Sequence, residues 1–261
     1  MIRYQDRLVN TLNSLENLPH SVLLLGDVGA GHDDVCEHIS SLFNLVMYKI
    51  QDTISNEYVD EILSSKTKSL YCFDMSRLSV REQNIILKLY EEPSEYVYIV
   101  LNSSYGDYVL DTIKSRSYEL KFDRYSDDQL IEYMNADIIN TPIKDLVLDI
   151  CTTPGLVEIS NHTDMTGLFS LCSKMISSMK TANFQNAMSI SNKINYSDSY
   201  DKYDLNLFIK MLKYVILNSD INDKKYVYDI VKKNLEHISS INNKQQTIEH
   251  MIIELWRYFK N

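Results

Sequence analysis

The sequence is poor in the residues that mark fibrous, low-complexity or disulfide-rich chains. Its 261 residues include only 6 glycines and 4 prolines, which excludes a collagen-like or low-complexity chain. The 4 cysteines are Cys36, Cys72, Cys151 and Cys172, and no two have the spacing of a zinc ribbon or suggest a disulfide framework. We therefore expect reduced thiols and a cytoplasmic location.

Long apolar runs are also absent. The longest, 22–25 and 96–101, are far too short to cross a bilayer, and residues 1–7 contain no apolar core of a signal peptide. Basic residues are fewer than acidic ones, 26 against 36, which gives a formal net charge of −10. This balance argues against a protein that holds DNA by itself through a broad basic face. We expect no contact with a membrane.

Short apolar segments alternate with helical patterns over the first 124 residues. Strands are expected at 21–25, 69–73, 96–101 and 117–122. Helices are expected at 5–18, 33–43 and 79–91. This alternation predicts βαβ units and a parallel sheet, and thus an α/β domain over 1–124. From about residue 125 the patterns are helical only.

A glycine-rich segment, 26–33, lies between an expected strand and an expected helix and reads G-D-V-G-A-G-H-D. This is the context of a phosphate-binding P-loop, G-x-x-x-x-G-K-[ST]. Gly26, Gly29 and Gly31 fit, because backbone N–H groups can converge on phosphate only where no Cβ intrudes. However, His32 replaces the lysine and Asp33 replaces the Mg²⁺-binding Ser/Thr. We favour a degenerate P-loop over a plain glycine turn or a working but atypical loop.

The adjacent His32 and Asp33 also suggest a metal site of the kind found in phosphohydrolases. Cys36 and His38 are nearby, but of the three nitrogen and sulfur ligands only His32 and Cys36 share a helical face. A metal centre of that kind needs several more ligands. We therefore expect neither a metal nor another cofactor.

A second series of motifs follows the glycine segment. An expected strand ends at Asp74, and the next helix carries Q-N-I-I-L-K-L-Y-E-E-P over 83–93. A further strand ends near Asn102, and T-I-K-S-R spans 112–116. In order and spacing, this series resembles the clamp-loader branch of the AAA+ superfamily. It looks most like the delta-prime subunits of bacterial DNA polymerase III.

The resemblance implies an architecture and a set of partners. It implies a RecA-like AAA+ domain over 1–124, a helical lid over 125–165 and an all-helical collar over 166–261 that assembles with other subunits. The partners would be clamp-loader ATPase subunits in a hetero-oligomeric, pentameric ring, a sliding clamp, and primer–template DNA held within the complex.

The departures from the family pattern all remove ATP chemistry. Asp74 and Asn102 stand at the Walker B and sensor 1 positions, but Met75 replaces the Walker B glutamate, and 154–158, which resembles the sensor 2 region, contains no basic residue. Phosphoryl transfer depends on positioning and charge stabilisation. With the two changes in the glycine segment, four elements of hydrolysis are missing, so we expect no ATPase activity. The family's zinc module is missing too, which suggests a compact version from a virus or a reduced genome.

Arg116 and Ser115 complete the resemblance. In the family this arginine is a finger offered in trans to ATP on the adjacent subunit, with the serine as part of the motif. A guanidinium is permanently charged and forks onto phosphate oxygens. The alternative is a surface arginine paired with Asp111 or Glu119.

Ser79, Arg77 and Arg81 lie at the start of the helix expected at 79–91. Helices near this position line the DNA channel in clamp loaders, so these residues are candidates for phosphate contacts. A solvated face, with Arg81 beside Glu82, is the alternative.

Three functions stay open. The preferred one is a non-hydrolysing, delta-prime-like clamp-loader subunit that supplies an arginine finger. The first alternative is an atypical active AAA+ ATPase that uses His32. The second is a delta-like subunit that opens the clamp, although such subunits usually lack the S-R motif present at 115–116.

Overall fold

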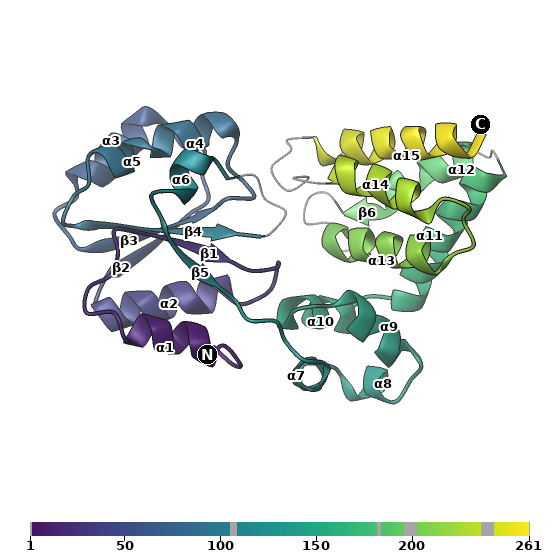
Figure 1. Ribbon diagram of the computed structural model, residues 1–261, viewed down its shortest axis with the longest axis horizontal. Helices are drawn as coiled ribbons and strands as arrows, with labels where there is room; N and C mark the ends of the chain where they lie inside the picture. The colour runs from purple at the N-terminus through teal and green to yellow at the C-terminus, as the bar shows by residue number, and fades with distance from the viewer. Residues whose placement is uncertain (1, 105–108, 182–183, 196–202, 236–242, 261) are drawn as a thin grey trace. The chain divides into compact units, whose positions relative to one another are not determined.

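The computed structural model describes residues 2–104, 109–181, 184–195, 203–235 and 243–260. The described chain divides into two compact units, the first ending at Arg124 and the second beginning at Tyr125 (Figure 1). Each unit has its own hydrophobic clusters.

A five-stranded parallel sheet forms the centre of the N-terminal unit, in the order β2-β3-β4-β1-β5. The strands are β1 Ser21–Leu25, β2 Val46–Ile50, β3 Ser69–Asp74, β4 Val97–Ser103 and β5 Tyr118–Lys121. Parallel strands joined by crossover helices form an α/β domain, so the predicted α/β fold with a parallel sheet, followed by a helical region, is confirmed.

Helices cover both faces of this sheet (Figure 1). One face carries α1 Asp6–Asn13 and α2 His32–Phe43, and the other carries α3 Asn56–Ser64, α4 Val80–Ile86, α5 Lys88–Glu91 and α6 Asp111–Lys114. Successive strand residues point to opposite faces, so Leu23 and Leu24 of β1 lie in different hydrophobic clusters. The central strands are buried on both sides, which explains their continuous apolar sequences.

Several elements differ from the sequence predictions. The interval 44–68 contains β2 and α3, neither of which the apolar pattern had indicated. Side chains of the edge strand β2 are exposed or half-buried, so the strand lacks a continuous apolar run. The helix expected at 79–91 is interrupted at Leu87 and forms α4 and α5. The first helix covers only Asp6–Asn13 of the expected 5–18.

Helices dominate the C-terminal unit. They are α7 Asp127–Ile131, α8 Ala136–Ile139, α9 Ile143–Ile150, α10 Pro154–Asn161, α11 Met165–Lys180, α12 Phe184–Ser189, α13 Leu205–Asn218, α14 Lys224–Leu235 and α15 Lys244–Lys260, with a 3-10 turn at Ser191–Lys193. Two strands of two residues each, β6 Ile194–Asn195 and β7 Tyr203–Asp204, pair in parallel. The expectation of helices alone was wrong at these two short strands.

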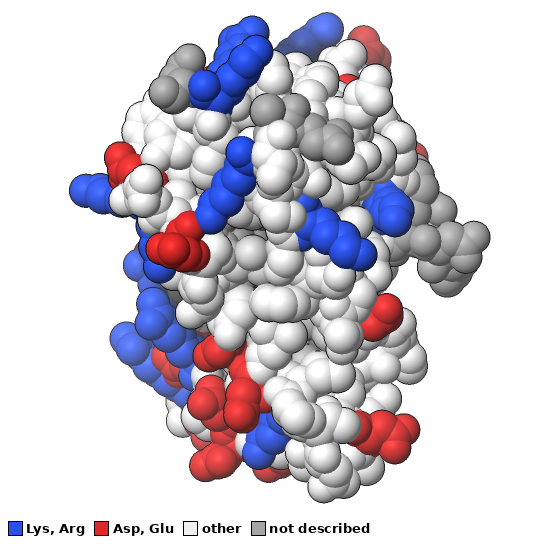
Figure 2. Space-filling view, turned by 90° about the vertical axis from the view of Figure 1, so that its right-hand side faces the viewer, with Lys and Arg blue, Asp and Glu red and all other residues white. Residues whose placement is uncertain are grey.

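The predicted division of this unit at residue 165 stays a prediction. Buried side chains from both sides of it, including Leu156 and Leu168, belong to one hydrophobic cluster. Among the described helices, none combines the length and the apolar character needed to cross a membrane. On the face shown in Figure 2, Lys and Arg side chains are separated by uncharged and acidic ones and form no continuous basic surface.

Candidate functional site: the glycine loop and Arg116

The glycine loop, 26–31, lies at the carboxyl edge of the sheet, where β1 ends. Asp74 of β3 and Asn102 of β4 are register partners at this same edge, and Asn102 is also in register with Leu24 of β1. The Cys36 thiol of α2 donates to Asn102 Oδ1 across 3.5 Å. The structure thus brings together the predicted glycine-loop, Walker B and sensor 1 positions, as parallel strands with a common direction require.

Two glycines of the loop have left-handed backbone conformations. Gly29 has φ of 79° and Gly31 has φ of 106°, values that side chains with a Cβ rarely adopt. Gly31 also precedes α2 directly, so the loop runs into the N-terminus of that helix. The backbone therefore keeps the path of a strand–loop–helix phosphate motif.

Phe122 lies against this loop. A Cβ built on Gly26 would lie 2.5 Å from Phe122 Cδ2, and one on Gly31 would lie 3.9 Å from Phe122 Cε1. The rings of Phe122 and His32 have centroids 4.7 Å apart. Phe122 is 6% exposed and belongs to the cluster beneath α1 and α2. Close packing against an aromatic ring thus accounts for glycine at position 26 without a phosphate. Sequence reasoning missed Phe122 because it was seen only as the end of a strand.

Asp33, which replaces the Ser/Thr of the P-loop pattern, forms an ion pair with a lysine of β2. Lys49 Nζ of β2 lies 2.9 Å from Asp33 Oδ2 and 3.8 Å from Glu37 Oε1. The hydrogen bond to Asp33 raises the pKa of Lys49 against the opposing effect of partial burial, so the lysine stays protonated. Lys49 was not predicted as a site residue, because β2 itself was not predicted.

Asp74, the remaining Walker B residue, is bound within its own turn. Its Oδ1 accepts from the Ser76 N–H at 3.0 Å, and its Oδ2 lies 3.5 Å from Arg77 Nε. Arg77, a candidate for DNA phosphate contact, is thus the ion-pair partner of a predicted site residue. Met75 is fully buried, so the position of the Walker B glutamate points into the apolar core.

Ser79, another candidate for phosphate contact, is engaged in a capping box. Its Oγ donates to Glu82 Oε2 at 2.6 Å, and the Glu82 N–H donates back to Ser79 Oγ at 3.3 Å. Burial raises the pKa of Glu82, but hydrogen bonds from Ser79 and from the Ile54 N–H outweigh this and lower the pKa overall. A carboxylate therefore lies at this helix start. Arg81 is exposed and forms no ion pair with the residues the structure describes.

Arg116 lies at the opposite edge of the sheet. It lies in the short turn between α6 and β5, and Tyr118 of β5 is in register with Val22 near the start of β1. At about 3.3 Å per residue, β1 separates this edge from the glycine loop by more than about 10 Å. The Arg116 guanidinium is exposed, and its Nη1 donates to the Thr112 carbonyl at 3.0 Å and lies 3.5 Å from Ser115 Oγ.

The acidic neighbours of Arg116 pair with lysines. Asp111 Oδ1 lies 3.5 Å from Lys114 Nζ, and Glu119 Oε1 lies 2.6 Å from Lys121 Nζ. The pairing of Arg116 with Asp111 or Glu119, considered from the sequence, is therefore not the arrangement in the structure. The guanidinium keeps its charge available to an outside anion.

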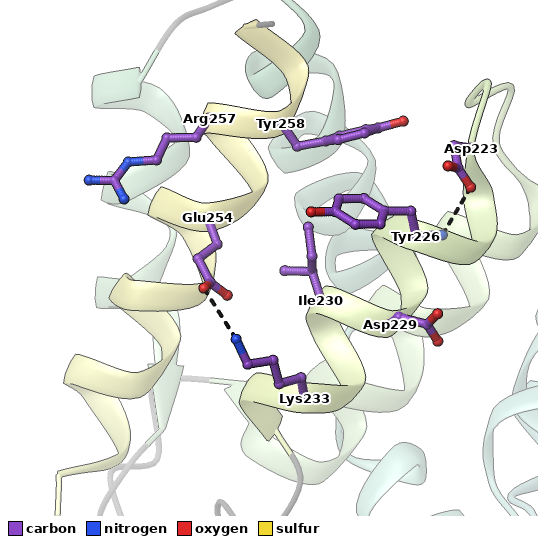
Figure 3. A pocket seen from close by; sticks show the side chains of 8 residues that line it. All are labelled: Asp223, Tyr226, Asp229, Ile230, Lys233, Glu254, Arg257 and Tyr258. Atoms are coloured by element: carbon purple, nitrogen blue, oxygen red, sulfur yellow. Dashed lines mark hydrogen bonds and ion pairs between the residues drawn. The ribbon is translucent and has the colours of Figure 1, made fainter.

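A separate groove of about 880 Å³ lies between α14 and α15 (Figure 3). The rings of Tyr226 and Tyr258 line the groove, with centroids 5.1 Å apart. Lys233 Nζ of α14 lies 3.7 Å from Glu254 Oε1 of α15. Tyr226 is 52% exposed. Side chains of both charge signs line this groove, so no single ligand chemistry is indicated. Among the described residues, no group of three or more His, Cys, Asp or Glu side chains could hold a metal ion.

Comparison with protein families supports the motif resemblance for part of the chain. Residues 47–126 match a family model. The matched family is the DNA polymerase III delta subunit. The match covers less than a third of the chain; it includes Asp74, Asn102 and Arg116 but begins after the glycine loop. No curated protein matches the sequence.

Among solved structures, similar chains come from Thermotoga maritima. One is a DNA polymerase III gamma subunit-related protein, with 17% identity, a TM-score of 0.48, and coverage of 98% of this chain and 99% of that one. Another is the RuvB Holliday junction branch migration motor, with 15% identity, a TM-score of 0.43, and coverage of 89% and 74%.

Proposed function

We propose that this protein is a non-hydrolysing, delta-prime-like subunit of a sliding-clamp loader and supplies Arg116 in trans to a neighbouring ATPase subunit. One observation carries the proposal. The Arg116 guanidinium is exposed, charged and unpaired with any described carboxylate, at the sheet edge opposite to the chain's own glycine loop. An arginine at that edge cannot reach a nucleotide at the other edge, so any nucleotide that it contacts would be bound by another subunit.

The condition of the glycine loop supports the non-hydrolysing part. The P-loop lysine is replaced by His32, whose ring packs on Phe122. The Mg²⁺-binding hydroxyl is replaced by Asp33, which is bound to Lys49. Asp74 is bound to Arg77, and the adjacent Met75 is buried. Each group that would hold phosphate, metal or attacking water is thus absent or engaged elsewhere.

The delta-prime-like role is favoured over the delta-like one by T-I-K-S-R at 112–116. The matched family is described as the delta subunit of DNA polymerase III, and the matched segment contains this motif. Assembly into a ring with ATPase subunits, a clamp and primer–template DNA is part of the same proposal.

The test compares the wild-type protein with Arg116→Ala in an assay of ATP hydrolysis by the partner ATPase subunit. In other systems an arginine finger contributes about 10³–10⁵ in rate, so we expect the stimulated rate to fall by a large factor. Arg116→Lys should restore little, because lysine lacks the fork geometry. Arg7→Ala, which changes an exposed arginine of α1, is the matched control. An unchanged stimulated rate in Arg116→Ala would refute the proposal.

Calorimetry with Mg·ATP tests the proposal that this chain does not itself bind or hydrolyse ATP. We expect no binding to the isolated chain. Micromolar binding together with turnover by the isolated chain would favour an atypical active ATPase instead.

A further inference from the structure

Three hydroxyl groups meet beneath the turn that carries Arg116. Ser117 Oγ lies 3.1 Å from both Ser21 Oγ, at the start of β1, and Tyr90 OH, in α5. Ser21 Oγ and Tyr90 OH are 2.9 Å apart. Ser117 Oγ also donates to the Ile113 carbonyl of α6 at 2.9 Å. We call Ser21, Tyr90 and Ser117 the hydroxyl ring.

Each oxygen of the hydroxyl ring has a hydrogen-bond partner. Because Ser117 gives its proton to the Ile113 carbonyl, Ser117 can only accept within the ring, and the protons of Ser21 and Tyr90 fill two of the three contacts at any one time. Ser21 is 3% exposed. Burial raises the pKa of Tyr90 despite hydrogen bonds to Ser117 and Ser21, so the phenol keeps its proton and can donate. The ring links β1, α5 and the start of β5 at one point.

The turn held by the hydroxyl ring has little stability of its own. Helix α6 has only four residues, which is too short to form independently. At its other end, the Leu110 N–H donates to Oε1 of the fully buried Gln83 at 3.0 Å. The Arg116 guanidinium in turn donates to the Thr112 carbonyl of α6. The direction of the guanidinium therefore follows the placement of α6.

We propose that Tyr90 and Ser117 are positioning residues, which hold the α6 turn so that Arg116 is presented in one orientation to the neighbouring subunit. This inference rests on the proposed function of Arg116. A cysteine at position 117 would replace the hydroxyl by a thiol, which is a weak donor and acceptor. Serine completes a network of oxygen partners at 2.9–3.1 Å that a cysteine would complete only weakly.

The first test uses the chain alone and does not depend on a partner. The amides of Arg116 and Ser117 donate to the carbonyls of Ile113 and Lys114 at 3.0 and 3.3 Å. Tyr90→Phe removes one hydroxyl of the ring and keeps the aromatic ring. We expect hydrogen exchange of these two amides to become several-fold faster, with little change in the central strands. Tyr118→Phe, which removes a hydroxyl from a 41% exposed tyrosine outside the hydroxyl ring, is the control.

Ser117→Ala provides a second variant with the same expected exchange, and thermal unfolding shows that both variants are folded. Unchanged protection at residues 116 and 117 in both variants would overturn the positioning role. Equal acceleration throughout the N-terminal unit would also overturn it, because the effect would then be general destabilisation.

The second test measures stimulation of the partner ATPase. Misplacement by about 1 Å can cost as much as 10²-fold in rate, so Tyr90→Phe and Ser117→Ala should lower the maximal stimulated rate about tenfold. The concentration for half-maximal stimulation should stay the same, since neither residue is placed in the interface. Ser117→Cys should give a maximal stimulated rate between that of the wild type and that of Ser117→Ala.

Comparison with Arg116→Ala separates the two proposals. Loss of stimulation in Arg116→Ala, together with full stimulation in Tyr90→Phe and Ser117→Ala, would overturn the positioning role and leave the proposed function intact. Full stimulation in Arg116→Ala would overturn the proposed function itself.

Discussion

The two edges of the parallel sheet in the N-terminal unit differ in how their polar groups are used. At the carboxyl edge, Asp33 and Asp74 are each bound to a cation of the same chain, and Phe122 packs on the glycine loop. At the amino edge, the lysines neutralise the local acids and leave the guanidinium of Arg116 exposed. At the carboxyl edge the charged groups are thus paired within the chain, whereas at the amino edge the Arg116 guanidinium remains exposed to solvent.

This difference separates stability from interaction. Changes at the carboxyl edge should alter folding free energy and leave stimulation of a partner intact once the protein is folded. Changes at the amino edge around Arg116 should lower the stimulation of a partner and leave the folding free energy nearly unchanged.

Phe122→Ala should cause the largest decrease in the free energy of unfolding. It removes a 6% exposed aromatic ring that contacts Gly26 and His32, and comparable truncations cost about 3–5 kcal/mol. Chemical denaturation measures this loss. Phe43→Ala, at a partly buried phenylalanine at the end of α2, is the matched control and should cost less. A loss at Phe122 no greater than at Phe43 would show that the loop does not depend on this ring.

Gly26→Ala should cost about 1–3 kcal/mol, because the new Cβ would lie 2.5 Å from the Phe122 ring and would force it to move. Gly167→Ala, in α11 of the other unit, would also place a Cβ close to neighbouring side chains, so its stability cost can be compared with that of Gly26→Ala. In the double variant Gly26→Ala with Phe122→Leu, the two costs should not add, since the clash is relieved. Full additivity in a double-mutant cycle would contradict the contact.

Ser79→Ala should cost about 1 kcal/mol through loss of the capping box of α4. Ser126→Ala removes the equivalent cap of α7 and is the matched control. Stimulation of a partner ATPase should be unchanged by Ser79→Ala. A specific loss of DNA binding by the assembled complex would instead return Ser79 to its predicted role as a phosphate contact.

The smallest expected effect is the pH dependence of the stability that Glu82 contributes. The pKa of Glu82 is lowered in the folded protein from its ordinary value of 4.5, so ionised Glu82 stabilises the fold above that pH. This contribution is lost as the pH falls through the folded pKa. The difference in unfolding midpoint between wild type and Glu82→Gln should therefore be present at pH 7 and shrink as the pH falls below 4.5. A difference that is constant over this range would exclude the charge as its cause.

Sequence reasoning predicted the parts of this molecule that carry strong local signals. The buried strands at Ser21–Leu25 and Ser69–Asp74 are continuous apolar runs between helical patterns. These features depend on neighbours in sequence. They give the fold class and place the glycine loop, Asp74 and Asn102 at one edge of the sheet.

The rest depends on contacts between distant residues. Lys49 pairs with Asp33 from an edge strand that has no clear apolar pattern. Phe122 reaches a loop nearly one hundred positions earlier in the chain. The hydroxyl ring joins residues from three separate elements. No local periodicity encodes such contacts, and only the assembled sheet shows that Arg77 pairs with a carboxylate, whereas Arg116 bonds to the Thr112 carbonyl and to no described carboxylate.

The contact between Phe122 and Gly26 has a consequence for any attempt to give this loop the P-loop sequence. Lysine and threonine at positions 32 and 33 would leave the aromatic ring against the loop, and Lys49 would keep only the more distant Glu37 carboxylate. A loop open to phosphate would thus require further substitutions at Phe122 and Lys49, so the packing around the loop resists a change confined to the loop itself.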